Sequence, residues 1–199
     1  MGCDIHLYVE RLHKGRWVPV NPPGGASPRK ADGSPDYSAE DYWDNWARWL
    51  EPESEVEQLA NTGKEFEDIT PSAGNAWAFG RDYRAFGQLA GVRGPGPIFL
   101  ERRGLPDDIS PQLIEVFYCD TEGRWREGKP IEYQGSTRWG DPDMHSNHWY
   151  DLLELRSALH ERGSGVEGRI RQLKVEMEKI AAAYQIGPLD VRTVFGFDN

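Results

Sequence analysis

Two polar residues near the start of the chain, Asp4 and His6, are the side chains best placed to do chemistry. They are two residues apart, and side chains at that spacing point to the same face of a β-strand. A carboxylate and an imidazole held side by side can bind one metal ion or exchange a proton with a substrate. The segment 1–10 therefore predicts a polar site on one face of an N-terminal strand, whose other face carries Ile5, Leu7 and Val9.

A second polar cluster, residues 141–149, contains Asp141, Asp143, His145 and His148. We expect it to form a loop that precedes a strand or a helix. Zn²⁺ binds three such oxygen and imidazole ligands together with a water, which then ionises near neutral pH, and Mn²⁺ accepts a similar set with more carboxylate. If the two polar segments meet, they build one open metal site. Its ligands would be Asp4, His6, Asp143 and His145.

The same residues also allow catalysis without a metal ion. His6 and His145 would then act as base and acid across a phosphodiester, with Asp4 beside them. A structural interpretation stays open, in which each histidine is a hydrogen-bonded polar residue and Asp141 and Asp143 only shape a turn. The two interpretations differ in whether the two imidazoles face one pocket.

The charge of the chain restricts its partners. A net charge of −10 opposes tight, sequence-independent binding to genomic nucleic acid, which depends on neutralising many phosphates. Five arginines nevertheless fall within residues 81–103, where the only acids are Asp82 and Glu101. Because the arginine fork matches phosphate and carboxylate groups, this local cluster favours a small anionic ligand. Surface ion pairs with the many carboxylates are the alternative.

The residues expected to bind that ligand come from three segments. Arginines would pair with its phosphate groups, an aromatic ring would stack on its base, and His148 would lie in the same pocket. The arginines are Arg81, Arg84 and Arg103, and the aromatic residues are Tyr83 and Trp149.

Length and composition predict a cytoplasmic protein with one domain over residues 1–199. A chain of this size buries enough surface to fold without a disulfide or a metal ion. Its two cysteines do not form a disulfide framework, and no segment resembles a signal peptide. No apolar run approaches the ~20 residues that cross a bilayer, so we expect no membrane partner. Self-association into a homo-oligomer is left open.

The order of the expected elements gives the fold class. A hairpin joins the first strand to residues 17–20 through a turn at 13–15, and residues 190–197 alternate like a final strand. Ser110 with Pro111, and Asp151 with Glu154, are helix-start signals. Residues 21–37 are rich in Pro, Gly and Ser and are expected to form a mobile loop.

The clearest helical pattern is a long amphipathic helix over residues 164–185. Its apolar residues recur at steps of three and four, as in a helix with one buried side. Together these elements predict an α+β fold, in which a mainly antiparallel sheet has its helices packed on one side.

Several motifs, spread over most of the chain, resemble a family of small, largely uncharacterised proteins of bacteriophages and prophages. They are residues 1–6 (Met-Gly-Cys-Asp-Ile-His), 81–86, 89–93, 103–110, 145–149 and 194–199. The resemblance implies a protein that works in the bacterial cytoplasm during infection. Phage proteins of this size often counter host defence, and many anti-defence proteins cleave or sequester nucleotide second messengers.

These observations lead to three hypotheses about function. The first is an enzyme that hydrolyses a phosphodiester in a small nucleotide, such as a cyclic dinucleotide immune signal. The second is a sponge that binds the nucleotide in the same pocket without chemistry. The third is a protein that blocks a host enzyme by direct binding through its acidic surface or its long helix.

Overall fold

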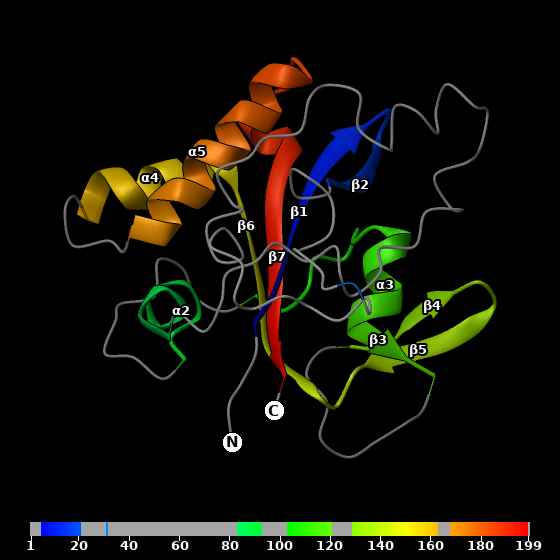
Figure 1. Cartoon of the computed structure of the whole chain (residues 1–199). Helices are drawn as coiled ribbons and strands as arrows, with labels where there is room; N and C mark the ends of the chain where they lie inside the picture. Colours follow the sequence, from blue (N-terminus) through cyan, green and yellow to red (C-terminus); the bar gives the residue numbers. More distant parts are fainter. Residues whose placement is uncertain are drawn as a thin grey trace.

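The computed structural model describes residues 5–20, 31, 83–92, 103–120, 129–162 and 168–198. Its centre is a four-stranded antiparallel sheet with the strand order β2-β1-β7-β6 (Figure 1). The strands are β1 (Ile5–His13), β2 (Arg16–Val20), β6 (Met144–Asp151) and β7 (Val191–Asp198). The first and last described strands of the chain, β1 and β7, are therefore neighbours in the middle of the sheet.

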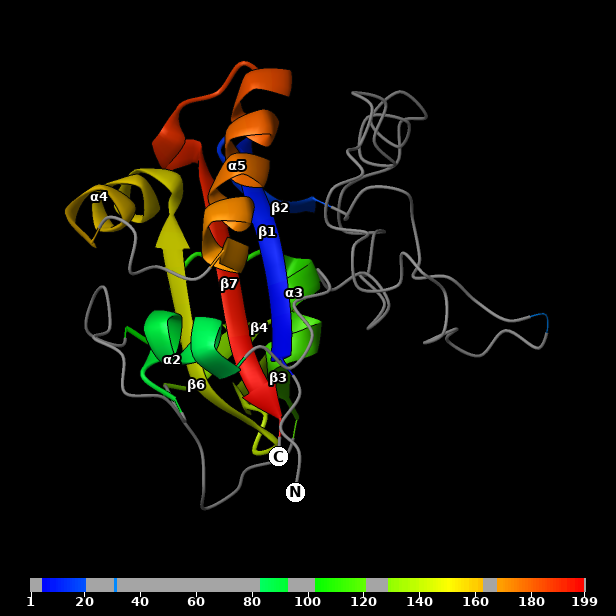
Figure 2. The same ribbon diagram turned by 60° about the vertical axis from the view of Figure 1, so that its left-hand side comes forward.

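Three helices cover one face of this sheet, which we call the three-helix face (Figure 2). They are α2 (Tyr83–Ala90), α4 (Leu152–Arg162) and α5 (Gly168–Ala183). Their buried residues pack against apolar side chains of β1 and β7 in the larger hydrophobic core. The sheet contributes Leu7, Val9, Phe195 and Phe197 to that core, and all four are fully buried.

The opposite face of the sheet packs against α3 (Pro111–Phe117), and we call it the α3 face. Tyr8 and Val194 of the sheet join Leu113 and Phe117 of the helix in a second hydrophobic cluster. A three-stranded antiparallel sheet in the order β3-β5-β4 lies beside α3 (Figure 1). Its strands are β3 (Tyr118–Cys119), β4 (Ile131–Tyr133) and β5 (Ser136–Gly140).

The predicted α+β class is confirmed, with helices and antiparallel sheets in one fold. The expectation that all helices pack on one side is wrong. Because α3 presents its own apolar residues to Tyr8 and Val194, the central sheet is buried on both faces.

Local sequence signals form the expected turns and caps. The β1–β2 turn places Lys14 and Gly15 at φ of 49° and 80°, the left-handed region that a tight hairpin requires. Ser110 caps α3, since its side chain accepts a hydrogen bond from the Leu113 N–H. Before α4, the Glu154 N–H donates to the Asp151 carboxylate and the Asp151 N–H donates to Glu154.

Residues 144–151 form strand β6, whereas we expected an irregular loop around residues 141–149. The strand pairs with β7 and contains a β-bulge between His145 and His148. Ser146, inside the bulge, has a φ of 54°. One extra residue in the bulge breaks the alternation of apolar and polar residues that would have revealed the strand.

The predicted long helix is present as α5, from Gly168 to Ala183, and its buried side includes Ile170, Leu173, Met177 and Ile180. Almost all of the predicted loop over residues 21–37 lies outside the described residues. Within the described part of the chain, no helix is both long enough and apolar enough to cross a membrane.

Candidate functional site

The two polar segments predicted to meet do lie close together in the sheet. Strand β1, with His6, and strand β6, with His145, flank β7 on its two sides. In the register of the sheet His6 is opposite Gly196, and His145 is opposite Phe197. Opposite residues in an antiparallel pair share a face, and consecutive residues point to opposite faces. The two imidazoles therefore lie on opposite faces, and the prediction that they share one pocket is wrong.

His145 lies on the three-helix face, where its contacts with neighbouring residues fix its ring in place. Its ring stacks on Phe197, with 5.7 Å between the ring centroids, and its Nδ1 lies 3.0 Å from Ser146 Oγ. Asp143, expected beside it as a metal ligand, is exposed in the turn before β6. Its N–H donates to Asp141 Oδ1 at 2.9 Å, which is the turn-shaping role of the structural interpretation.

His148 is fully buried on the same face as His145, because the bulge sets both histidines opposite alternate residues of β7. Its Nδ1 accepts a hydrogen bond from the Arg103 N–H at 3.1 Å, and its ring packs edge-on against Tyr150 and Phe195. A fully buried imidazole with these neighbours has no surface for a soluble ligand.

Arg103 and Trp149, predicted to contact a phosphate and a base, contact each other instead. The guanidinium carbon of Arg103 lies 3.7 Å from the centre of the Trp149 ring. The same guanidinium donates to both oxygens of Glu154, at 2.7 and 2.8 Å. This two-point pairing satisfies the charge of Arg103, so a phosphate would have to displace Glu154.

The remaining predicted ligand contacts are divided between α2 and segments outside the described residues. Tyr83 and Arg84 begin α2 on the three-helix face, where Tyr83 is half-buried and Arg84 is exposed. Arg81 and Asp4 lie outside the described residues. The structure thus separates α2 from His6 by the thickness of the sheet.

His6 forms a partly exposed polar pair on the α3 face. Its Nε2 lies 3.1 Å from Asp198 Oδ2, and the two side chains are 26% and 36% exposed. Asp198 is a residue that our reading of the sequence missed as a site residue. The alternation of residues 191–197 could have located it, because it places Asp198 on the face opposite to Phe195 and Phe197.

Gly196 separates His6 from Asn147 across the sheet. A Cβ atom at position 196 would overlap with Asn147 Oδ1 and would lie 3.0 Å from Phe117 Cε1. The buried amide of Asn147 therefore lies directly over the backbone of β7, next to the residue that faces His6. Only glycine leaves that space.

The described side chains around His6 do not form a metal site. Among residues 5–20, 31, 83–92, 103–120, 129–162 and 168–198, no three His, Cys, Asp or Glu side chains gather around one point. His6 and Asp198 supply two donors, fewer than the three protein ligands typical of catalytic zinc. A carboxylate hydrogen-bonded to an imidazole can instead orient it and stabilise its protonated form during proton transfer.

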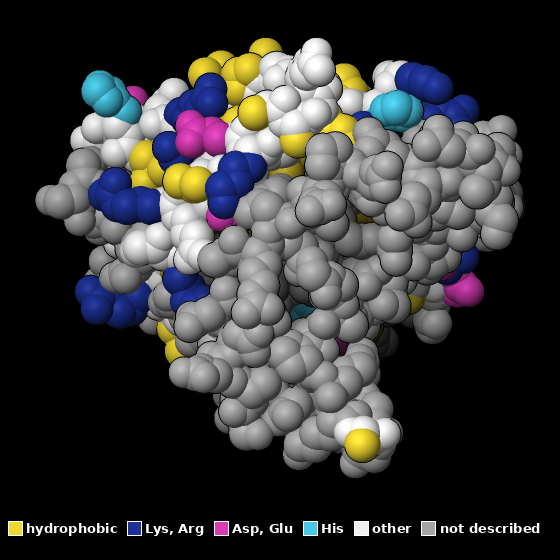
Figure 3. Space-filling model, turned by 45° about the horizontal axis from the view of Figure 1, so that its top comes forward, with side chains coloured by type: hydrophobic (Ala, Val, Ile, Leu, Met, Phe, Trp, Pro, Cys, Tyr) yellow, Lys and Arg dark blue, Asp and Glu magenta, His cyan; other side chains and the backbone are white. Residues whose placement is uncertain are grey.

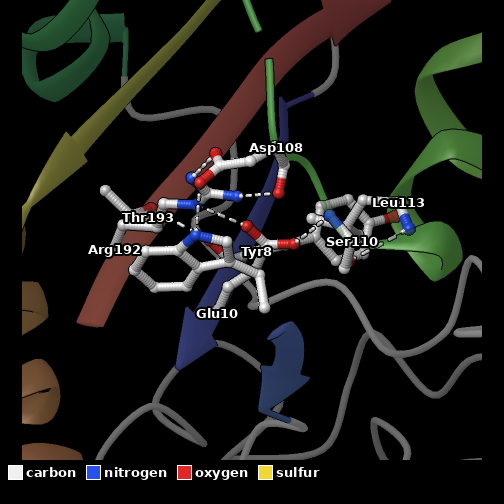
Figure 4. A network of polar contacts seen from close by, with 8 residues as sticks. Tyr8, Glu10, Asp108, Ser110, Leu113, Arg192 and Thr193 are labelled. Atoms are coloured by element: carbon white, nitrogen blue, oxygen red, sulfur yellow. Dashed lines mark hydrogen bonds and ion pairs between the residues drawn. The ribbon is translucent and has the colours of Figure 1, made fainter. Parts of the chain in front are cut away.

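A second polar network lies further along the same face, and its central ion pair is buried (Figure 4). Glu10 and Arg192, opposite each other on β1 and β7, form an ion pair of 2.6 Å with exposures of 0% and 2%. The other Glu10 oxygen accepts from the Ser110 N–H at 3.0 Å. Arg192 also donates to the side chain and the backbone carbonyl of Asp108.

Trp17 of β2 also belongs to this network. Its indole N–H donates to Asp108 Oδ2 at 2.8 Å, and the guanidinium of Arg192 lies 3.9 Å from its ring centre. Burial alone would raise the pKa of Asp108, but its hydrogen bond to Arg192 and the charge of Arg192 outweigh it, and the pKa is lowered. Every member is bonded to another member, so the network holds structure together.

Tyr8 lies between the two polar groups on β1. Its side chain is 2% exposed, and its hydroxyl has no hydrogen-bond partner among the described residues. Burial raises the pKa of Tyr8 to about 12, so the hydroxyl keeps its proton at neutral pH. The Tyr8 hydroxyl therefore does not take a proton from His6 at neutral pH.

Comparison of the chain with protein-family models, with curated proteins and with solved structures gives no match.

Proposed function

We propose that the protein hydrolyses a phosphodiester bond in a small nucleotide, with the His6–Asp198 pair as its proton-transfer group. The supporting observation is that this pair combines a 3.1 Å contact with side chains that are about a quarter and a third exposed. The nucleotide class, with a cyclic dinucleotide immune signal as the leading example, follows from the resemblance to phage proteins.

In this reaction His6 acts through its second ring nitrogen. Since Nε2 is bonded to Asp198, Nδ1 is the nitrogen that takes a proton from the attacking water. The water oxygen bonds to phosphorus as the bond to the leaving sugar oxygen breaks. The proton then passes from His6 to that oxygen, so the imidazole returns to its starting state. Asp198 holds the ring and stabilises the imidazolium between the two transfers.

No step is assigned to a metal ion, because the described residues offer two donors at this point. The predicted Zn²⁺ or Mn²⁺ site would need Asp4, which precedes the described part of β1. Chelation therefore tests this part of the proposal directly. If the turnover is lost with chelator and returns with Zn²⁺ or Mn²⁺, the metal belongs to the mechanism.

A sponge that binds the nucleotide without cleaving it is the second candidate. The observation that favours it is the position of His145, on the opposite face from His6, which removes the two-histidine acid–base arrangement. A sponge would release the intact nucleotide when the protein is heated.

The test is to incubate the purified protein with cyclic and linear dinucleotides, with and without chelator, and to separate the products by chromatography. We expect His6→Gln to lower turnover by about 10²-fold or more, the usual contribution of a general base. His145→Gln, a matched change on the other face, should leave turnover within about twofold of the wild-type rate. Equal loss in both variants, or wild-type turnover in His6→Gln, would contradict the assignment.

Stability measurements separate catalysis from folding in the same experiment. The His6–Asp198 pair is partly exposed, so His6→Gln should change the free energy of unfolding by about 1 kcal/mol or less. A variant that is inactive and equally stable has lost a catalytic group. A variant that is inactive and unfolded gives no support to the proposal, and Asp198→Asn then provides the test.

A further inference from the structure

A groove between α4 and α5 gathers basic side chains on a strongly acidic protein. It has a volume of about 410 Å³ and is lined by Arg156, Leu159 and His160 of α4 and by Arg171, Lys174 and Val175 of α5. Figure 3 shows Lys and Arg side chains with acidic and hydrophobic ones in the area over these two helices. The groove lining thus combines basic side chains from both helices with two apolar side chains, Leu159 and Val175.

The local charge is opposite to that of the whole chain. Arg156, Arg171 and Lys174 contribute positive charge to the groove lining, and among the described residues Glu178 pairs with Arg156 and with Lys174. The chain as a whole has a net charge of −10. A cationic groove on such a protein attracts small anions that the rest of the surface repels.

Glu178 orders two of these cations. One of its oxygens accepts from Arg156 Nε at 2.9 Å, and the other pairs with Lys174 Nζ at 2.9 Å. Although burial alone would raise the pKa of Glu178, its hydrogen bonds to Lys174 and Arg156 lower it, so the carboxylate stays ionised. Because Arg156 uses only Nε in this contact, its two terminal nitrogens remain as donors for another anion.

We propose that this groove is a binding site for a small phosphate-bearing organic anion. An arginine fork matches two phosphate oxygens, and a lysine on the facing wall adds a second positive charge. The volume lies within the range of small-molecule pockets. Leu159 and Val175, the latter 40% exposed, would contact the organic part of the ligand.

This inference is independent of the proposed hydrolysis. The groove is formed by helices that cover the three-helix face, whereas His6 lies on the α3 face. A ligand in the groove therefore cannot reach His6 through the sheet. The site could serve a sponge as well as an enzyme, since binding alone is claimed for it.

Isothermal titration calorimetry of the whole protein with inorganic pyrophosphate and with ADP tests the proposal. We expect both to bind, with an affinity that falls as salt is added. Tighter binding of ADP would show that Leu159 and Val175 contact the nucleoside, and equal binding would show recognition of phosphate alone. Both outcomes support the site.

Variants of the groove residues test where the ligand binds, because some should weaken binding and one should strengthen it. Arg156→Gln and Arg171→Gln should each weaken binding by about fivefold or more, since each removes a groove cation. Lys179→Gln also removes one positive charge from α5, the helix of Arg171, but outside the groove lining. It should leave affinity unchanged within about twofold. Glu178→Gln should strengthen binding, because it removes the carboxylate that competes for Arg156 and Lys174. A folding defect cannot produce that gain.

Three results would overturn the proposal. The first is no binding of either probe at millimolar concentration. The second is an equal loss of affinity in Lys179→Gln and Arg156→Gln, which would indicate attraction to overall charge. The third is binding of a glutamate-rich peptide that neither pyrophosphate nor ADP displaces, which would make the groove a protein-docking surface.

Discussion

Two acid–base pairs on the same face of strands β1 and β7 differ in what surrounds them. Glu10 and Arg192 are 0% and 2% exposed, whereas His6 and Asp198, at the other end of the same strands, are 26% and 36% exposed. The buried pair is further bonded to Asp108 and to the backbone of Ser110. In the open pair, His6 Nε2 lies 3.1 Å from Asp198 Oδ2.

The difference separates a structural pair from the pair that we propose for catalysis. A buried ion pair must have all of its donors and acceptors satisfied, because each unpaired charge in the interior costs several kcal/mol. Such a pair has nothing left for a substrate. Glu10 and Arg192 instead fix the start of α3 and the loop that ends at Ser110 against the sheet. The partly exposed His6–Asp198 pair contributes little to stability. In the proposed mechanism its second ring nitrogen transfers the proton.

The largest effect that would test this comparison is expected from Arg192→Met. The substitution leaves the Glu10 carboxylate buried without its counter-charge, which typically costs about 3–5 kcal/mol. Urea denaturation followed by circular dichroism measures the change in the free energy of unfolding. A loss below about 1 kcal/mol would show that the buried pair is dispensable and would remove the contrast with His6.

A double variant separates the lost pair from the lost packing. In Glu10→Leu with Arg192→Met both charges are gone, so the penalty of an unpaired buried charge disappears. We expect the double variant to be more stable than Arg192→Met alone. If it is less stable, the arginine acts mainly through its packing on Trp17 and not through its charge.

The next largest effect is expected at Gly196 of β7, which lies opposite His6 of β1. Gly196→Ala places a methyl group against Asn147 Oδ1 and Phe117, and overpacking of this kind costs about 1–3 kcal/mol. Thermal unfolding of the variant measures it. At an unconstrained strand position the same substitution would instead stabilise the protein slightly.

Asn147→Ala is the matched partner for that experiment. It removes the amide that the methyl group would meet, so the combined variant should be less destabilised than the sum of the two single variants. Strict additivity would show that Asn147 does not lie over Gly196. The close approach of these residues, and with it the description of the surface beside His6, would then be wrong.

The sequence predicted the parts of the fold that repeat with a simple period. Alternation in residues 5–9 and 191–197 identified β1, β7 and the faces that they bury. Ser110 and Asp151 marked the starts of α3 and α4 because their side chains bond the first turn of each helix. These signals are local, and local chemistry is sufficient to produce them.

The wrong predictions concern features that depend on strand pairing and on the packing of α3 against the sheet. The bulge in β6 places His145 and His148, three residues apart, on one face, and no reading with a period of two finds that arrangement. Glu10 belongs to the polar face of the first strand, but α3 covers that face and turns it into an interior. Whether His6 and His145 share a pocket depends on how β1 and β6 are each aligned with β7. The sequences of the two segments alone do not reveal that alignment.

Asp108 gives the smallest expected effect and tests where the buried network ends. Its side chain is 68% exposed although it pairs with the buried Arg192. The pKa of Asp108 is lowered in the folded protein, so its ionised form contributes stability that is present above the ordinary value near 3.8. That contribution is lost as the pH falls through the lower, folded-state pKa. Asp108→Asn should therefore be less stable than the wild type at pH 7, by about 1 kcal/mol or less.

The pH dependence of that difference is the decisive measurement. Urea denaturation at pH 7, 5 and 3 should show the gap between wild type and Asp108→Asn shrinking below about pH 4. Asp107→Asn, a change of the same charge at the neighbouring exposed position, is the control and should show a smaller gap at pH 7. A gap of constant size from pH 7 to pH 3 would mean that Asp108 acts through geometry and not through its charge. The electrostatic network would then end at Glu10 and Arg192, wholly inside the protein, and the contrast with the open His6–Asp198 pair would be sharper.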